Sequence, residues 1–139
     1  MKKMSVSIFG LLIASTVGFT QQSTPSRLKV FIDCSSTWCD LQFIRSAINI
    51  VDFLLDNAAA DVHVLITSQG TGSGGDQYQL IFFGQKYFKN QTDTLRFSTD
   101  PNATEFEERE LLLQYLKTGL IPFISKTAAI KHIEISLGC

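Results

Sequence analysis

The sequence predicts an α/β (α+β) fold of two layers, in which a mixed sheet of about five strands carries two helices on one face. Short runs rich in β-branched and apolar residues indicate the strands. Two longer segments repeat their apolar residues every three to four positions, which indicates helices. The predicted order is strand, helix, three strands, helix, strand. Because the chain crosses over through a helix between them, the first two strands are expected to be parallel neighbours.

The first strand and first helix follow residue 27. Residues 28–33 are apolar, β-branched and too short for a helix, so they predict a buried strand that stops at Cys34. Thr37 and Asp40 then match a Thr-x-x-acid capping pattern at the start of a helix. Its expected apolar stripe consists of Phe43, Ala47, Ile48, Val51, Leu54 and Leu55, and its polar face of Arg45, Asn49, Asp52 and Asp56.

Three strands are expected in the middle of the chain. From Asp61 the apolar period changes to two, with Val62, Val64 and Ile66 on one face. A second run at 78–83 follows the glycine-rich loop 70–76, which predicts a hairpin. A third strand is expected at 93–99.

The second helix is predicted after the turn Asp100, Pro101, Asn102. Its first turn carries Glu105, Glu107 and Glu108, which suit the positive end of a helix. The expected buried face consists of Phe106, Leu112, Leu113 and Leu116. Gly119 is the expected C-terminal cap, followed by a separate apolar piece at 120–124 that Pro122 interrupts, and by a last strand at 130–137.

The N-terminus has the composition of a cleavable secretory signal. Lys2 and Lys3 precede an apolar segment at 6–19, and no other charged residue occurs before Arg27. The segment is shorter than a membrane-spanning helix and has no basic flank on its far side. We therefore expect a signal peptide at 1–20, a linker at 21–27 and a single α/β domain at 28–139, exported to the periplasm without a membrane span in the mature chain.

The charge balance argues against nucleic acid as a partner. Loss of the signal removes two of the 12 basic residues and none of the 13 acidic ones, which leaves a net charge of about −3. No basic surface follows from such a composition.

Three cysteines occur in the chain, namely Cys34, Cys39 and Cys139. In an oxidising compartment Cys34 and Cys39 are close enough in sequence to form a disulfide. Two free thiols and a redox-active pair are the alternatives, because thiol oxidoreductases also place their pair between a strand and a helix. Those enzymes have two residues between the cysteines, whereas this loop has four.

No other pattern predicts a catalytic, metal or cofactor site. Cys39 and Arg45 have the Cys-x5-Arg spacing of a phosphatase loop, but the residues between them are bulky and begin with a carboxylate. The two histidines lack zinc-ligand spacing. The loop 70–76 lacks the Lys-Ser/Thr ending of a phosphate loop. We therefore expect neither a cofactor nor a metal.

An ordered set of segments resembles the N-terminal region of a family of uncharacterised exported proteins from Gram-negative bacteria. The resemblance covers roughly residues 28 to 127. It is carried by residues 30–34, by Cys39, Asp40, Phe43, Ile44 and Arg45, and by the ranges 60–67, 71–75, 93–96 and 116–120. In that family the region is followed by strands that look like an outer-membrane β-barrel. The resemblance implies either a truncated relative or a domain that stands alone, and it implies no catalytic residue. The order of elements is also similar to that of the N-terminal domain of TolB and of CsgG-type periplasmic domains.

Two functional hypotheses follow from the sequence. The first is a non-enzymatic periplasmic domain that contacts a protein partner in the cell envelope and is associated with an outer-membrane protein. Its candidate contacts are the hairpin tip, Gly72, Ser73, Gly74 and Gly75, and the polar helix face with Arg45, Asn49 and Asp52. The second is a thiol-disulfide oxidoreductase that uses Cys34 and Cys39.

Overall fold

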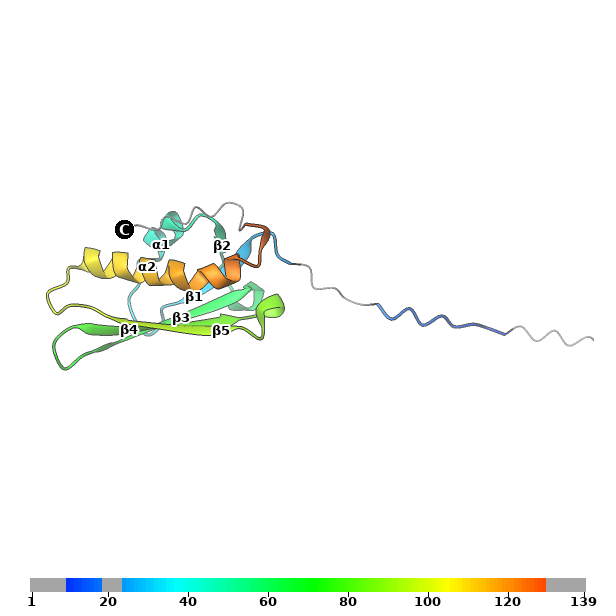
Figure 1. The fold of residues 1–139 in the computed structure, drawn as a ribbon, viewed down its shortest axis with the longest axis horizontal. Helices are drawn as coiled ribbons and strands as arrows, with labels where there is room; N and C mark the ends of the chain where they lie inside the picture. The colour runs from blue at the N-terminus through cyan, green and yellow to red at the C-terminus, as the bar shows by residue number, and fades with distance from the viewer. Residues whose placement is uncertain (1–9, 19–23, 130–139) are drawn as a thin grey trace, which may run out of the picture.

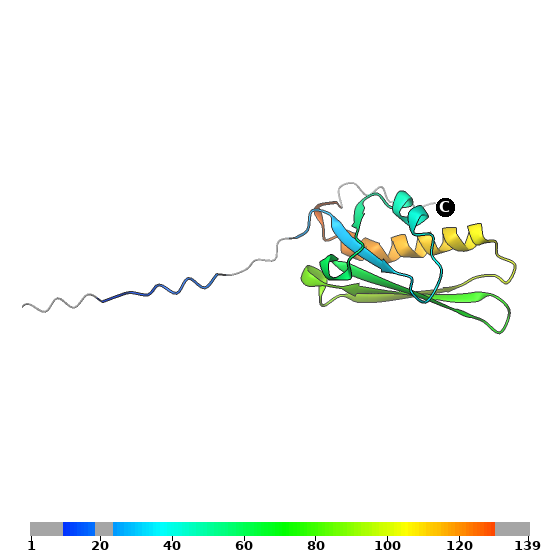
Figure 2. The same cartoon turned by 180° about the vertical axis from the view of Figure 1, so that it is seen from behind.

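Five strands form one mixed sheet in the computed structural model, which describes residues 10–18 and 24–129. The strands lie in the order β2-β1-β3-β4-β5. Both helices lie on the same side of this sheet, as Figures 1 and 2 show from opposite directions. The strands are β1 (Leu28–Asp33), β2 (Val51–Phe53), β3 (Val62–Gly70), β4 (Asp76–Gly84) and β5 (Thr92–Ser98), and the helices are α1 (Leu41–Ala47) and α2 (Glu105–Ile124).

The pairing of the strands confirms the mixed sheet. β1 is parallel to β3, with Val30 opposite Val62, as expected for strands joined by a crossover. β3, β4 and β5 form an antiparallel meander. The predicted hairpin joins β3 to β4. The strand expected at 130–137 lies outside the described residues.

The core lies between the sheet and the two helices. Val62, Val64 and Ile66 of β3 are fully buried, which confirms the predicted alternation. They pack in one hydrophobic cluster with Leu80 and Phe82 of β4. Both helices add apolar side chains to this cluster, namely Ile44 of α1 and Leu112, Leu113, Leu116, Leu120, Phe123 and Ile124 of α2.

The first helix is much shorter than predicted. It ends at Ala47, and the continuation of its expected stripe forms β2, an edge strand parallel to β1. The run from Ile48 to Val51 is rich in β-branched residues, and the free edge of β1 offers backbone partners that a helix would leave unused. The cap is also different, because the Asp40 carboxylate accepts a hydrogen bond from the Phe43 N–H at 3.0 Å, whereas Thr37 does not cap the helix.

The second helix is longer than predicted. It begins at the N-cap Thr104, which forms a capping box with Glu107, and continues through Gly119 and Pro122 to Ile124. Gly119 is therefore not a C-terminal cap but a packing position, since a Cβ atom there would lie 2.0 Å from the ζ carbon of Phe82. Pro122 is exposed, so the carbonyl that loses its helical partner is within reach of solvent. Phe106 was expected in the core but is 60% exposed.

Candidate functional site

A disulfide between Cys34 and Cys39 joins the end of β1 to the start of α1. The two Cα atoms are 6.1 Å apart. Both cysteines are partly buried and pack against the hydrophobic core. The predicted pairing is therefore confirmed, and the bond closes the loop that connects the first strand to the first helix.

The disulfide-closed loop presents Trp38 to solvent. The indole side chain is 71% exposed and is the single tryptophan of the chain. The preceding residue anchors the loop, because the hydroxyl groups of Thr37 and Ser68 are 2.7 Å apart and hydrogen bonded. This bond connects the loop to β3. The exposed ring is thus held on a loop that is fixed at both cysteines and at Thr37.

A cleft of about 350 Å³ lies beside this loop, and its lining includes Trp38, Asp40, Asp76, Tyr78, Glu108 and Arg109. The cleft is next to the carboxyl ends of the parallel strands β1 and β3. The chain leaves β1 toward β2 on one side and leaves β3 toward β4 on the other. The lining therefore comes from the loop after β1, the facing ends of β3 and β4, and the first turns of α2.

Arg109 is the only basic residue among the described residues that line the cleft. Its guanidinium lies 3.3 Å from the Asp40 carboxylate and 4.3 Å from the centre of the Phe43 ring. This pair connects α2 to the N-terminal cap of α1. Since Asp40 balances the charge of Arg109, the remaining carboxylates leave the cleft acidic.

Tyr78 is buried at the base of the cleft. It is only 9% exposed, and its ring stacks on Phe97 at a centroid distance of 4.9 Å. Its hydroxyl makes no hydrogen bond to any residue in the described part of the chain. Burial raises the pKa of Tyr78, and the negative charges of Glu108 and Asp76 raise it further. The neutral phenol therefore has both hydrogen-bonding capacities available to a ligand.

The hairpin tip named from the sequence lies at the surface except for its last residue. Gly72, Ser73 and Gly74 are exposed, and Gly74 has the positive φ of 97° that favours glycine. Gly75 is buried against the turn before α2, where a Cβ atom would lie 2.2 Å from the Thr99 carbonyl oxygen. Three of the four residues are therefore at the surface, and Gly75 serves packing.

The expected polar helix face does not exist as a single face. Arg45 is exposed on α1, Asn49 lies in the turn after it, and Asp52 belongs to β2. Asp52 is paired with Arg27, whose Nε donates to its carboxylate at 2.9 Å. The prediction of one helix face was wrong because the helix ends before Asn49.

The uncovered face of the sheet is a surface that sequence reasoning missed. Phe31, His63 and Phe83 form a row across β1, β3 and β4, with neighbouring ring centroids 5.2 and 5.9 Å apart. The His63 Nε2 lies 3.5 Å from an Asp33 carboxylate oxygen. The alternating pattern of these strands could have indicated the row. The residues that alternate with the buried ones are aromatic in each strand, and the strand pairing places them opposite one another.

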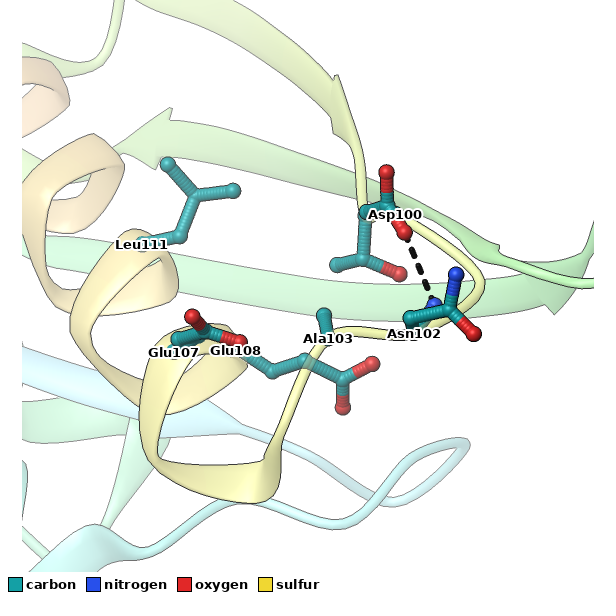
Figure 3. A pocket seen from close by; sticks show the side chains of 7 residues that line it. Asp100, Asn102, Ala103, Glu107, Glu108 and Leu111 are labelled. Atoms are coloured by element: carbon teal, nitrogen blue, oxygen red, sulfur yellow. Dashed lines mark hydrogen bonds between the residues drawn. The ribbon is translucent and has the colours of Figure 1, made fainter.

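A second hollow of about 580 Å³ lies between the turn after β5 and the start of α2 (Figure 3). Two of its carboxylates make hydrogen bonds within the chain. Asp100 accepts a hydrogen bond from the Asn102 N–H at 2.8 Å, and Glu107 belongs to the capping box of α2. These side chains therefore stabilise the turn and the helix end.

Comparisons of the chain with protein-family models, with curated proteins and with solved structures found no match. Within residues 10–18 and 24–129, no helix has the length and apolar character needed to cross a membrane. The same residues contain no group of three or more His, Cys, Asp or Glu side chains arranged to hold a metal ion.

Proposed function

We propose that the chain is an exported, non-enzymatic domain that binds a partner in the cell envelope through the surface around Trp38. The observation that carries this proposal is the 71% exposed indole on a disulfide-closed loop. Tryptophan is enriched among the residues that dominate binding energy at protein interfaces. A fixed loop also loses little conformational freedom when a partner binds.

Two features support export. The basic start and short apolar segment are typical of a secretory signal, and disulfides persist in oxidising compartments. The described part of the apolar segment contributes nothing to the core, since its large apolar side chains are 75 to 97% exposed; these are Leu11, Leu12, Ile13 and Val17. A segment that the folded domain does not need is consistent with a cleaved signal.

The oxidoreductase alternative is less well supported. A catalytic thiol needs a stabilised thiolate, usually beside a positive charge or at a helix N-terminus. Here Cys39 is followed by Asp40, whose carboxylate already occupies the start of α1 and opposes a second negative charge. The four-residue separation and the packing of both cysteines against the core favour a structural bond.

Site-specific cross-linking in the native host tests the proposal. A photoreactive amino acid is placed at position 38 and, as the matched control, at the exposed Lys89, which follows the other end of β4. We expect an adduct with an envelope protein from position 38 and none from position 89. Equal adducts from both positions, or no adduct from position 38, would contradict the proposal.

A further inference from the structure

β5 is an edge strand whose outer side has no strand partner in the part of the chain that the structure describes. Its seven residues pair with β4 on the inner side. The Gln91 carbonyl accepts a hydrogen bond from the Gly84 N–H at 2.8 Å. At the other end of the strand, the Thr99 N–H donates to the Asp76 carbonyl at 2.8 Å. Since only alternate residues of an antiparallel strand face their partner in this way, the backbone groups of the residues between them point outward; these are Thr92, Thr94, Arg96 and Ser98.

The outer edge of β5 is open to the addition of another strand. Proteins commonly protect a free edge with proline, lysine, a bulge or a very short strand. β5 contains neither proline nor lysine, and its register with β4 is unbroken from one end to the other. The opposite edge of the sheet is β2, which has only three residues. Of the two edges, β5 is therefore the one that can pair over several residues.

The two ends of β5 carry opposite charges. Asp100 and Glu107 line the hollow that follows the strand. Lys126 lies beside the start of the strand, where its Nζ donates to the Gln91 side chain at 2.7 Å, and Lys89 is exposed in the preceding turn. An antiparallel pair of two such strands brings the acidic end of each beside the basic end of the other. The edge therefore complements the same edge of a second copy in charge.

We propose that the chain forms a dimer in which β5 pairs with β5 of a second copy about a two-fold axis at Leu95. This register pairs every residue of the strand and joins the two five-stranded sheets into one. Leu95, which packs against the core but is only partly buried, lies against Leu95 of the second copy. Thr94 then lies opposite Arg96, and Asp93 opposite Phe97. No like charges face each other across the pair.

Sedimentation equilibrium of the purified protein tests the dimer. Thr94→Pro removes an outward N–H and leaves the hydrogen bonds to β4 in place, so the fold should tolerate it. Thr94→Val is the matched control, because it keeps the N–H and the branched side chain. We expect the wild type and Thr94→Val to dimerise. The dissociation constant of Thr94→Pro should be at least about tenfold higher, since each copy loses a hydrogen bond.

A cysteine cross-link tests the register without relying on the proline variant. Leu95→Cys is made together with Cys139→Ser, which removes the cysteine that lies outside the Cys34–Cys39 disulfide. Opposite residues that do not exchange backbone hydrogen bonds have Cα atoms about 4.5 Å apart, which a disulfide can span. Asp93→Cys in the same background is the control, because position 93 lies opposite position 97 in this register. We expect mild oxidation to link two copies through position 95 and not through position 93.

The inference is overturned if the wild type is a monomer, if folded Thr94→Pro dimerises as tightly as Thr94→Val, or if positions 93 and 95 cross-link equally. The dimer goes beyond the proposed function and does not use the surface around Trp38. That loop follows β1, and both β3 and β4 lie between β1 and β5 in the sheet. An adduct from position 38 on a monomeric protein would therefore overturn only the dimer, and a dimer without such an adduct would contradict only the proposed envelope partner.

Discussion

Replacement of both cysteines by serine separates a structural disulfide from a catalytic one. The bond joins residues with a sequence separation of 5, so it closes a short loop. The chain-entropy relation for such a loop gives a loss of about 2 kcal/mol in the free energy of unfolding. A domain of ordinary size has a stability of about 5–15 kcal/mol, so the Cys34→Ser/Cys39→Ser variant should still fold.

Urea denaturation measures this loss. The oxidised wild type should unfold at a higher urea concentration than the double variant, and reduction should shift the wild type to about the midpoint of the variant. Reductant should leave the variant unchanged, which is the internal control. A variant as stable as the oxidised wild type would refute the structural role. A wild type that catalyses thiol exchange, lost in a folded double variant, would refute the non-enzymatic account.

Two further perturbations test the packing and the electrostatics of the domain. Gly119→Ala should destabilise the domain by up to about 2 kcal/mol, because the added methyl group displaces the buried Phe82 ring at about 1–3 kcal/mol while the higher helix propensity of alanine returns about 1 kcal/mol. The control Lys117→Ala, at an exposed position of α2, should change the melting temperature little. A stabilised Gly119→Ala variant would contradict the close packing of Gly119 on Phe82. Hydrogen bonds from Ser35, its backbone N–H first, and the nearby His63 lower the pKa of Asp33 below its ordinary value of 3.8. Its contribution to stability is therefore present above pH 3.8 and lost as the pH falls through the lowered pKa. The Asp33→Asn variant should therefore lose less stability below about pH 4 than the wild type does. Denaturation of both proteins at several pH values measures this loss. An equal loss in both proteins would contradict the contribution of the Asp33 carboxylate.

The elements that could be predicted from the sequence depend on local pattern. β1, β3 and β4 were predicted because their apolar residues are β-branched or alternate, and the glycine-rich loop between β3 and β4 indicated the hairpin. The spacing of Cys34 and Cys39 likewise predicted the disulfide, given an oxidising compartment.

The elements that were missed depend on distant parts of the chain. The pattern of residues 51–55 fits a helical stripe as well as a strand. Val51–Phe53 forms a strand because it pairs with the free edge of β1. Gly119 lies inside α2, where it faces the ring of Phe82 on β4 and leaves no room for a Cβ atom. Neither of these two contacts can be predicted from the periodicity of the local sequence.

The cleft could not be predicted for the same reason. Its lining combines the disulfide-closed loop, the start of β4 and the first turns of α2, which are separated by tens of residues in sequence. Tyr78 appeared in the sequence only as part of a strand. Its role as a buried phenol facing Asp76 and Glu108 requires the packing of α2 across the sheet.

Intact mass spectrometry of the protein from the periplasmic fraction tests both the export of the chain and the state of its disulfide. The sample is alkylated before and after reduction. We expect a chain that lacks about its first 20 residues and whose Cys34 and Cys39 are alkylated only after reduction. A full-length chain in the cytoplasmic fraction, with both cysteines alkylated without reductant, would contradict an exported domain that contains this disulfide.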